Sequence, residues 1–207
     1  MLHYRSFGEG ETLVFLHGFL ESSTMWSYLP LNEIQRHCVL IDLPGHGENK
    51  EIFLKEETIV AYAKWVHEKL TEANIVEYDL IGHSMGGPMI VKLAAARPSY
   101  TKALLILAGS MDPAAEKPEK WRPVLFKTPL NYLVPGALRP SNEELWYLKK
   151  DLVEMKPEYE KITCPVYILH GTKDILVPYS NVAYTQQMLT KTDSVFVTTY
   201  EKENHFI

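Results

Sequence analysis

Short runs of apolar residues recur along the chain, and glycine, proline or aspartate bounds most of them. Within each run the apolar residues are consecutive and do not alternate with polar ones, which is typical of strands buried on both faces of a sheet. The predicted strands are Thr12–His17, Cys38–Asp42, Tyr78–Gly82, Ala103–Leu107, Val166–His170 and Val195–Thr199.

Helical patterns lie between several of these strands. Across Thr58–Leu70 the apolar side chains recur at the three- and four-residue spacing of one helix face. Pro88–Ala96 is apolar nearly all round, as expected for a helix buried against a sheet. Strands that alternate with helices predict an α/β fold: a mostly parallel, doubly wound sheet with helices on both faces.

Residues 110–161 interrupt this alternation. They are rich in proline and show no strand pattern, but Ser141–Met155 has one apolar face and opens with the spacing of a capping box, which predicts a helix. We interpret residues 110–161 as a small helical lid over the carboxyl edge of the sheet, where open α/β sheets bind ligands. The core then consists of residues 1–109 and 162–207.

Composition narrows the class of protein without identifying it. The 207 residues suit one compact domain, and a hydrophobic content of 46% is ordinary for a globular chain. The formal net charge of −5 gives no reason to expect nucleic acid or an anionic membrane as a partner. The sequence shows no apolar run of membrane-spanning length and no secretory signal, and we interpret Cys38 and Cys164 as free thiols. We therefore expect a cytoplasmic protein.

The most informative motif is Gly82-His83-Ser84-Met85-Gly86-Gly87, between a predicted strand and a predicted helix. A serine in this position occupies a sharp, strained turn, and glycines at 82 and 86 let the neighbouring backbone approach closely. The turn lifts the hydroxyl of Ser84 clear of the sheet at the start of a helix, where backbone N–H groups stabilise negative charge. Ser84 is therefore the candidate nucleophile.

Five motifs in sequence order resemble those of the α/β-hydrolase superfamily and together cover nearly the whole chain. They are Leu16-His17-Gly18-Phe19, Asp42-Leu43-Pro44-Gly45-His46-Gly47, the motif around Ser84, His170-Gly171-Thr172-Lys173-Asp174 with Val177-Pro178, and Asn204-His205-Phe206. The resemblance implies that Asp174 lies in the acid loop and that His205 is the catalytic histidine. It also implies an oxyanion hole built from the backbone N–H groups of Phe19 and Met85.

These assignments agree with elementary chemistry. A serine hydroxyl is a weak nucleophile at neutral pH and needs an adjacent base, for which histidine is suited, and a carboxylate holds that histidine in the right tautomer. Ser84, Asp174 and His205 have the chain order of this fold, and each follows a predicted strand. Asp112 follows another strand and stays open as the acid; the other interpretation is that it caps a turn before Pro113.

Four other histidines are interpreted as structural. We expect His83 to point away from the nucleophile and to serve packing, and His17 to orient the oxyanion loop. His46 is expected to stabilise its glycine-rich loop, and His170, which ends a strand, to make a structural hydrogen bond. Asp42 is expected to organise the loop that follows it.

Other chemistries find no support in the sequence. It contains no complete dinucleotide fingerprint, Walker loop, paired-cysteine zinc pattern or His-Glu-x-x-His motif, so we expect neither an organic cofactor nor a metal. The dehalogenases and epoxide hydrolases of this superfamily use an aspartate nucleophile, and Ser84 argues against both. Apolar side chains of the lid, among them Trp121, Phe126 and Trp146, are expected to shape the substrate pocket.

The chain departs from the superfamily in two respects. The lid is short, which predicts a shallow or partly open pocket. The sequence also stops at Ile207, two residues after His205, where the superfamily continues into a helix. We therefore expect the sequence to represent a truncated or incomplete form of a longer protein.

The leading hypothesis is hydrolysis of a small carboxylic ester or thioester through an acyl-enzyme. The expected partner is a small molecule, not nucleic acid or a membrane, and the sequence does not indicate the oligomeric state. A second hypothesis uses the same three residues for carbon–carbon bond hydrolysis, perhydrolysis or a lyase step. A third is a non-catalytic binding module on the same fold.

Overall fold

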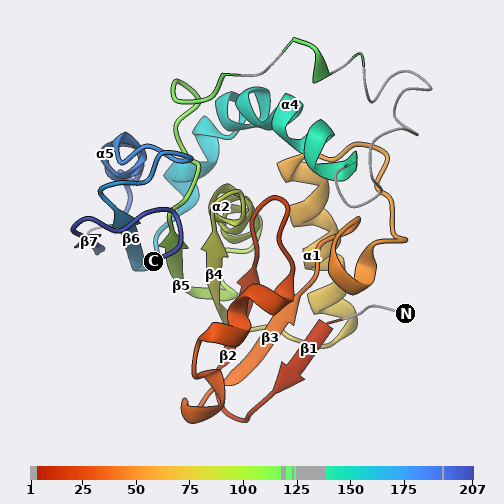
Figure 1. The fold of residues 1–207 in the computed structure, drawn as a ribbon. Helices are drawn as coiled ribbons and strands as arrows, with labels where there is room; N and C mark the ends of the chain where they lie inside the picture. The colour runs from red at the N-terminus through yellow and green to blue at the C-terminus, as the bar shows by residue number, and fades with distance from the viewer. Residues whose placement is uncertain (1–3, 118–119, 123, 125–138, 193) are drawn as a thin grey trace.

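The computed structural model describes residues 4–117, 120–122, 124, 139–192 and 194–207. Its centre is a seven-stranded sheet with the order β1-β3-β2-β4-β5-β6-β7 (Figure 1). The strands are β1 (Tyr4–Phe7), β2 (Thr12–Leu16), β3 (His37–Ile41), β4 (Tyr78–His83), β5 (Thr101–Leu107), β6 (Val166–Gly171) and β7 (Val195–Tyr200). β1 runs antiparallel to β3, and the other neighbouring pairs are parallel. The mostly parallel sheet predicted from the sequence is confirmed.

β1 is the strand that the hydrophobic pattern does not reveal. It lies at the edge of the sheet, and all four of its residues are exposed. An edge strand of this kind needs no continuous apolar run, because neither of its faces is covered by a helix. The segment Tyr-Arg-Ser-Phe therefore carries no strong strand signal of its own.

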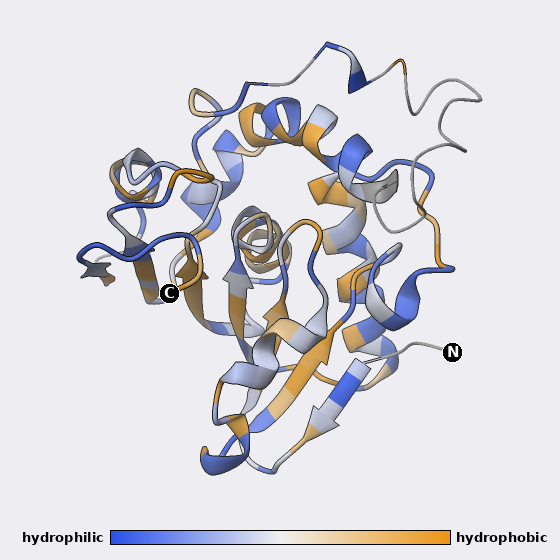
Figure 2. Ribbon diagram, viewed as in Figure 1, coloured by the Kyte–Doolittle hydropathy of each residue, from blue (hydrophilic) through white to orange (hydrophobic). Residues whose placement is uncertain are grey.

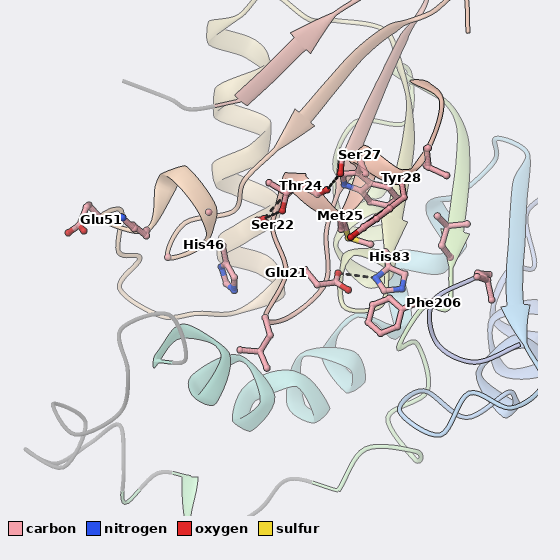
Figure 3. Close-up of a pocket in the computed structure, with 18 of the residues that line it drawn as sticks. Glu21, Ser22, Thr24, Met25, Ser27, Tyr28, His46, Glu51, His83 and Phe206 are labelled. Carbon is pink, nitrogen blue, oxygen red and sulfur yellow. Dashed lines mark hydrogen bonds and ion pairs between the residues drawn. The ribbon is translucent and has the colours of Figure 1, made fainter. Parts of the chain in front are cut away.

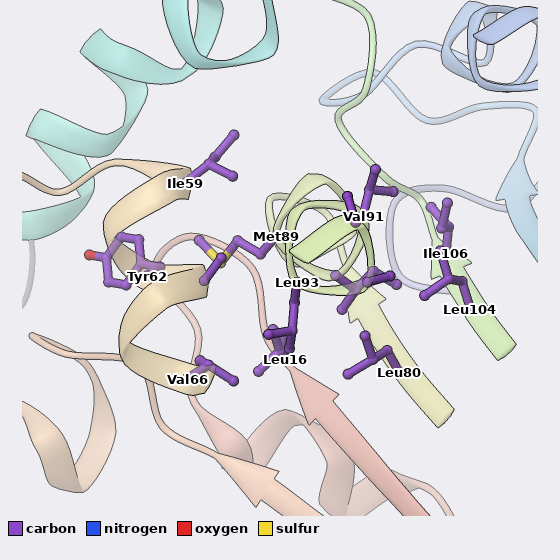
Figure 4. Packing of buried hydrophobic residues seen from close by; sticks show 14 of the residues in the cluster. Leu16, Ile59, Tyr62, Val66, Leu80, Met89, Val91, Leu93, Leu104 and Ile106 are labelled. Carbon is purple, nitrogen blue, oxygen red and sulfur yellow. The ribbon is translucent and has the colours of Figure 1, made fainter. Parts of the chain in front are cut away.

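Strand side chains alternate between two faces of the sheet, and the first face carries the larger apolar cluster. Leu80 and Leu104 of this face pack against the helix α2 (Gly86–Ala96), and the helix α1 (Ile59–Glu72) packs on α2 (Figure 4). The helix α5 (Ser180–Met188) and the 3-10 helix η6 (Lys156–Lys161) contribute Val182 and Tyr159 to the same cluster. α2 is buried on nearly every side, as the sequence predicts, because the sheet, α1 and η6 surround it.

The second face carries a smaller cluster under short 3-10 helices. Phe15, Leu40 and Ile81 of the sheet pack with Trp26 of η1 (Ser23–Tyr28) and Leu31 of η2 (Leu31–Glu33). The ring centroids of Phe15 and Trp26 lie 5.1 Å apart. Helices therefore cover both faces, but those on the second face are 3-10 turns in the described part of the chain.

The helix α4 (Arg139–Glu154) lies against α1 and against loops at the carboxyl edge of the sheet (Figure 1). The carboxylate of Asp151 accepts the N–H of Ile59 (2.8 Å), and the Tyr62 hydroxyl donates to Glu144 (2.5 Å). The hydroxyl of Ser141 accepts the N–H of Leu20 from the loop after β2 (3.3 Å). Polar and apolar residues alternate along α4 (Figure 2), which agrees with the amphipathic helix predicted there.

Candidate active site

The carboxyl ends of the parallel strands bring the candidate residues to one edge of the sheet. Ser84 follows β4 directly, Asp174 follows β6 and His205 follows β7. Phe19 follows β2, and β2 pairs with β4 in parallel, so the loop that carries Phe19 runs beside the serine turn. Residues far apart in the sequence are therefore neighbours at this edge.

The serine turn has the strained backbone that its motif predicts. Ser84 has a φ of 52°, in the left-handed region that side chains other than glycine rarely adopt. Its N–H donates to the carbonyl of Leu107 (2.9 Å), and its carbonyl accepts the N–H groups of Gly87 (3.0 Å) and Ser110 (3.1 Å). These bonds hold the strained residue between β5 and α2.

Neighbouring glycines make this turn possible. A Cβ atom at Gly82 would overlap the carbonyl oxygen of Gly86, and one at Gly86 would overlap the carbonyl oxygen of Leu16. A Cβ atom at Gly18 would lie 2.8 Å from the Cβ of Ser84. The oxyanion loop therefore passes against the serine at a separation that a larger residue would prevent.

Asp174 and His205 form a buried hydrogen-bonded pair. Oδ2 of Asp174 lies 2.7 Å from Nδ1 of His205, and the two residues are 6% exposed each. Oδ1 of Asp174 accepts the N–H groups of Leu176 (2.9 Å) and Val177 (2.8 Å). Because the backbone holds one carboxylate oxygen, the other is directed at the imidazole.

Asp112 takes a different position. Its Oδ1 accepts the N–H of Ala114 (2.8 Å), and its own N–H donates to the side chain of Asn181 (2.7 Å). This geometry is a turn cap next to Pro113, one of the two interpretations of Asp112 drawn from the sequence. Asp174 is the carboxylate that the structure brings to His205.

The environment of His205 favours the neutral imidazole. Burial lowers the pKa of His205 below the ordinary value, and the nearby His83 lowers it further. The hydrogen bond that His205 makes to Asp174 acts in the opposite direction and raises the pKa, but it does not outweigh burial. Within the described residues no hydrogen bond joins His205 to Ser84. Such contacts are often long before a substrate binds and shorten in the complex.

The loop after β2 contributes backbone N–H groups beside the serine. Among the residues that the structure describes, the N–H groups of Phe19 and Met85 have no acceptor. His17 holds this loop: it accepts the N–H of Leu43 at Nε2 (3.0 Å), so its proton lies on Nδ1, which donates to the carbonyl of Gly18 (2.7 Å). Burial and the neighbouring His46 lower the pKa of His17 to about 4, which keeps the ring neutral.

Glu21 is a charged residue of the site that no sequence motif indicated. Its Oε2 accepts the N–H of Gly18 (2.6 Å) and lies 2.9 Å from Nδ1 of His83. His83 is buried and its Nε2 lies 3.1 Å from the carbonyl oxygen of His205. His83 therefore makes polar contacts on both sides of its ring, in addition to the packing expected of it. The signal in the sequence that could have indicated Glu21 was a carboxylate three residues after Gly18.

The remaining histidines and Asp42 organise neighbouring loops. The carboxylate of Asp42 accepts the N–H groups of Ser23 (2.6 Å) and Glu48 (3.0 Å). His46 bonds the carbonyl of Pro44 (3.0 Å), and Nε2 of His170 bonds the carbonyl of Val177, 2.9 Å away. These contacts agree with the structural roles predicted for the three residues.

A cavity of about 1270 Å³ opens beside the segments that carry the candidate residues (Figure 3). Its wall includes Leu20, His83 and Phe206, which are the chain neighbours of Phe19, Ser84 and His205. Much of the remaining wall is apolar and comes from η1 and from the loop after β3. The apolar members of this remaining wall are Met25, Trp26, Tyr28, Leu29, Phe53, Leu107 and Ile207.

The lid residues predicted to shape the pocket do not line this cavity in the described part of the chain. Trp121 is 50% exposed, with the guanidinium of Arg122 above its ring, and Trp146 is half-buried on α4. Phe126 lies outside the described residues. A substrate contact of these side chains stays a prediction.

Neither a metal cluster nor a membrane helix is found among the described residues. No group of histidine, cysteine, aspartate and glutamate side chains there is arranged to hold a metal ion. No described helix has both the length and the apolar character needed to cross a bilayer. Cys38 and Cys164 are free thiols, as predicted.

The chain is similar to known proteins along its whole length. A family model described as the alpha/beta hydrolase fold matches residues 11–133. The (E)-2-((N-methylformamido)methylene)succinate hydrolase of Acinetobacter baylyi is 24% identical and aligns with 99% of this chain and 87% of its own. The pimeloyl-[acyl-carrier protein] methyl ester esterase of Pseudoalteromonas atlantica is 25% identical and aligns with 100% of this chain and 92% of its own.

Solved structures share the fold. The monoacylglycerol lipase of Paleococcus ferrophilus superposes with a TM-score of 0.79 at 20% identity, over 99% of this chain and 90% of its own. An esterase of Exiguobacterium antarcticum superposes with a TM-score of 0.73 at 16% identity, over 99% of this chain and 88% of its own.

Proposed function

Because the chain belongs to the α/β-hydrolase fold family, we propose that it is a serine hydrolase that cleaves a small carboxylic ester or thioester. Ser84 is the nucleophile, His205 the base and Asp174 the acid that orients the base. The observation that carries the proposal is the buried hydrogen bond between Asp174 and His205, at the sheet edge where Ser84 sits in a strained turn.

At the level of reaction class the chain is a hydrolase of ester bonds. This is the activity named for its pimeloyl-[acyl-carrier protein] methyl ester esterase relatives and for the monoacylglycerol lipase of Xenopus laevis, which is 27% identical over 90% of this chain. The identity of the acyl group and of the leaving group belongs to the proposal. Carbon–carbon bond hydrolysis, perhydrolysis and a lyase step use the same three residues and stay alternative predictions.

The proposed reaction begins with proton transfer. His205 accepts the proton of the Ser84 hydroxyl at Nε2 while the oxygen attacks the carbonyl carbon of the substrate. Asp174 keeps the proton of His205 on Nδ1 and balances the positive charge that develops on the ring. The tetrahedral intermediate carries its negative charge on the former carbonyl oxygen, which the N–H groups of Phe19 and Met85 bind.

Collapse of the intermediate completes acylation. The carbon–oxygen or carbon–sulfur bond to the leaving group breaks, and His205 donates its proton to the departing alcohol or thiol. Water then attacks the acyl-serine with His205 again as the base. The second collapse releases the carboxylic acid and returns the proton to Ser84. No step requires a cofactor.

We further propose that residues 110–161 form a lid on a core of residues 1–109 and 162–207. The position of α4 supports this division, because Ser141 and Glu144 lie beside His46 and Leu20, in loops that follow β3 and β2. The net charge of −5 and the apolar wall of the cavity favour an uncharged small molecule over nucleic acid as the partner. We place the protein in the cytoplasm because both cysteines are free thiols.

Separate replacement of the two candidate acids tests the assignment. We expect Asp174→Asn to lower kcat for p-nitrophenyl acetate on the order of 10³- to 10⁴-fold, because the wrong tautomer of His205 would then be held. Asp112→Asn, the matched control, should keep kcat within about 2-fold, because Asp112 caps a turn. Loss of turnover in the Asp112 variant alone would show that the acid is misassigned.

A further inference from the structure

The ring of His83 connects two parts of the site. It is 3% exposed and lies between the carboxylate of Glu21 and the backbone carbonyl of His205. Both partners are hydrogen-bond acceptors. Nδ1 faces the Glu21 carboxylate at 2.9 Å and Nε2 faces the carbonyl oxygen of His205 at 3.1 Å, so the ring bridges two acceptors.

Glu21 is the carboxylate of this contact. Burial acts to raise its pKa, but the interactions with His83 and the N–H of Gly18 outweigh burial, and its pKa lies below the ordinary value. The side chain of Glu21 is 13% exposed and that of His83 is 4% exposed, so little water reaches the contact between them.

Glu21 and His83 together contact the three segments that the proposed reaction needs. Glu21 fixes the N–H of Gly18, the residue before Phe19 in the oxyanion loop. His83 is the residue before Ser84 in the chain. Its other nitrogen fixes the backbone of His205, and its ring stacks on Phe206 with centroids 5.7 Å apart and planes at 28°.

We propose that Glu21 and His83 are a hydrogen-bonded pair of positioning residues that holds the loop of Gly18 and Phe19 and the loop of His205 in place beside Ser84. The inference rests on the proposed function, because it assigns a role within the same site. Asp174 orients the imidazole of His205 through its side chain, whereas His83 acts through the backbone of the same residue. Together the two contacts fix the position of His205 and the orientation of its ring.

The ring of His83 also bears on the proton affinity of the base. The rings of His83 and His205 lie 4.7 Å apart. Three ionisable groups face His205 from the elements around it: Asp174 after β6, His83 at the end of β4 and Glu21 after β2. The electrostatic interaction with His83 lowers the pKa of His205, so removal of the His83 ring should move the acidic limb of the rate profile to higher pH.

Activity measurements on His83→Gln, Glu21→Gln and the double variant test the proposal. We expect each single change to lower kcat for p-nitrophenyl acetate by about 10- to 100-fold with KM within about 2-fold, because the reacting groups are misplaced while the cavity is kept. The kcat of the double variant should be no lower than that of the less active single variant, because the two residues act as a unit. His83→Gln should also shift the acidic limb of kcat/KM upward.

His67→Gln is the matched control, because His67 lies on α1 and bonds Arg97 away from the site. It should match the parent protein in rate and pH profile. If His83→Gln and Glu21→Gln also match it while Ser84→Ala is inactive, the positioning role is overturned and the proposed function stands. If Ser84→Ala keeps full activity, the proposed function itself fails.

A spectroscopic measurement covers the case in which a variant does not fold. Nitrogen-15 NMR of the unaltered protein at pH 7 shows which ring nitrogens carry a proton. We expect a proton on Nδ1 of His83, where it faces Glu21, and a proton on Nδ1 of His205, where it faces Asp174. A His83 ring without a proton on Nδ1 would contradict its hydrogen bond to Glu21.

Discussion

At the scale of residues, the site depends on backbone that passes unusually close to other backbone. Ser84 adopts its positive φ because Leu107, Gly87 and Ser110 hold its peptide groups. Gly86 lies against the carbonyl of Leu16, at the point where β2 ends and the oxyanion loop begins. The same close packing that strains the serine therefore also positions the loop beside it.

Gly86→Ala tests this close approach. The added methyl group would overlap the carbonyl oxygen of Leu16, a backbone atom that cannot rotate away. We expect a loss of about 1–3 kcal/mol in the free energy of unfolding, measured by urea denaturation, together with a lower rate of ester hydrolysis. Gly87→Ala is the comparison, because its nearest neighbours include the flexible side chain of Met111, and it should cost less. Equal stability of both variants with the parent protein would contradict the packing argument.

A sequence motif predicts the local geometry of the site but not the contacts between distant residues. The turn around Ser84 was predictable because a short motif dictates its own geometry. Asp174 and His205 were predictable as candidates, but their contact depends on loops after two different strands. The contact of Glu21 with His83 joins residues 62 positions apart, and no local pattern of residues encodes it.

At the scale of elements, buried carboxyl groups join α4 to α1. Glu144 bonds the hydroxyl of Tyr62 in α1, and Asp151 accepts the first N–H of that helix. Burial raises the pKa of Asp151 to about 6 and that of Glu57, beside Tyr62, to about 7. Desolvation is the main cause in each case, because a carboxylate loses water that the protein does not fully replace.

These pKa values predict that stability falls as the pH rises. The folded state binds the proton of Glu57 more tightly than the unfolded chain does. The stabilisation that this proton gives to the folded state is therefore complete below about pH 4.5 and is lost as the pH rises toward 7. We expect Glu57→Gln to remove about 3 kcal/mol of that decrease in the free energy of unfolding. Urea denaturation at several pH values measures it, with Glu68→Gln, an exposed position on α1, as the control. An unchanged slope in the Glu57 variant would show that this carboxyl is not protonated when folded.

The strands and α-helices were largely predictable, and the misses have physical reasons. β2 to β6 and the helices α1, α2 and α4 have strong apolar patterns, and each lies within a few residues of its predicted range. β7 lies where a strand was predicted, but the prediction that it is buried was wrong, because β7 is an edge strand whose residues are all exposed or partly exposed. β1 was missed because an exposed edge strand has no apolar run. α5 was missed because its buried residues, Asn181, Val182 and Thr185, are mostly polar and give no clear helical stripe.

At the scale of the whole molecule, the parallel topology of the sheet determines where the candidate site lies. Six parallel strands end at one edge, so three loops that are distant in sequence bring the candidate serine, carboxylate and histidine to that edge. The cavity at this edge was not predictable in detail, because its wall combines η1, the loop after β3 and Phe206. The prediction that apolar lid residues shape the pocket came from their composition alone. Composition does not specify which surface of the protein these residues cover.

The most direct test of the account is labelling with a fluorophosphonate probe, which reacts with an activated serine. The folded protein should be labelled at neutral pH, and mass mapping should place the adduct on Ser84. Labelling should disappear in Ser84→Ala and slow strongly in Asp174→Asn, while Asp112→Asn should be labelled at the rate of the parent protein. Equal labelling of the parent protein and Ser84→Ala, or none in a folded parent, would contradict the claim that Ser84 is the catalytic nucleophile.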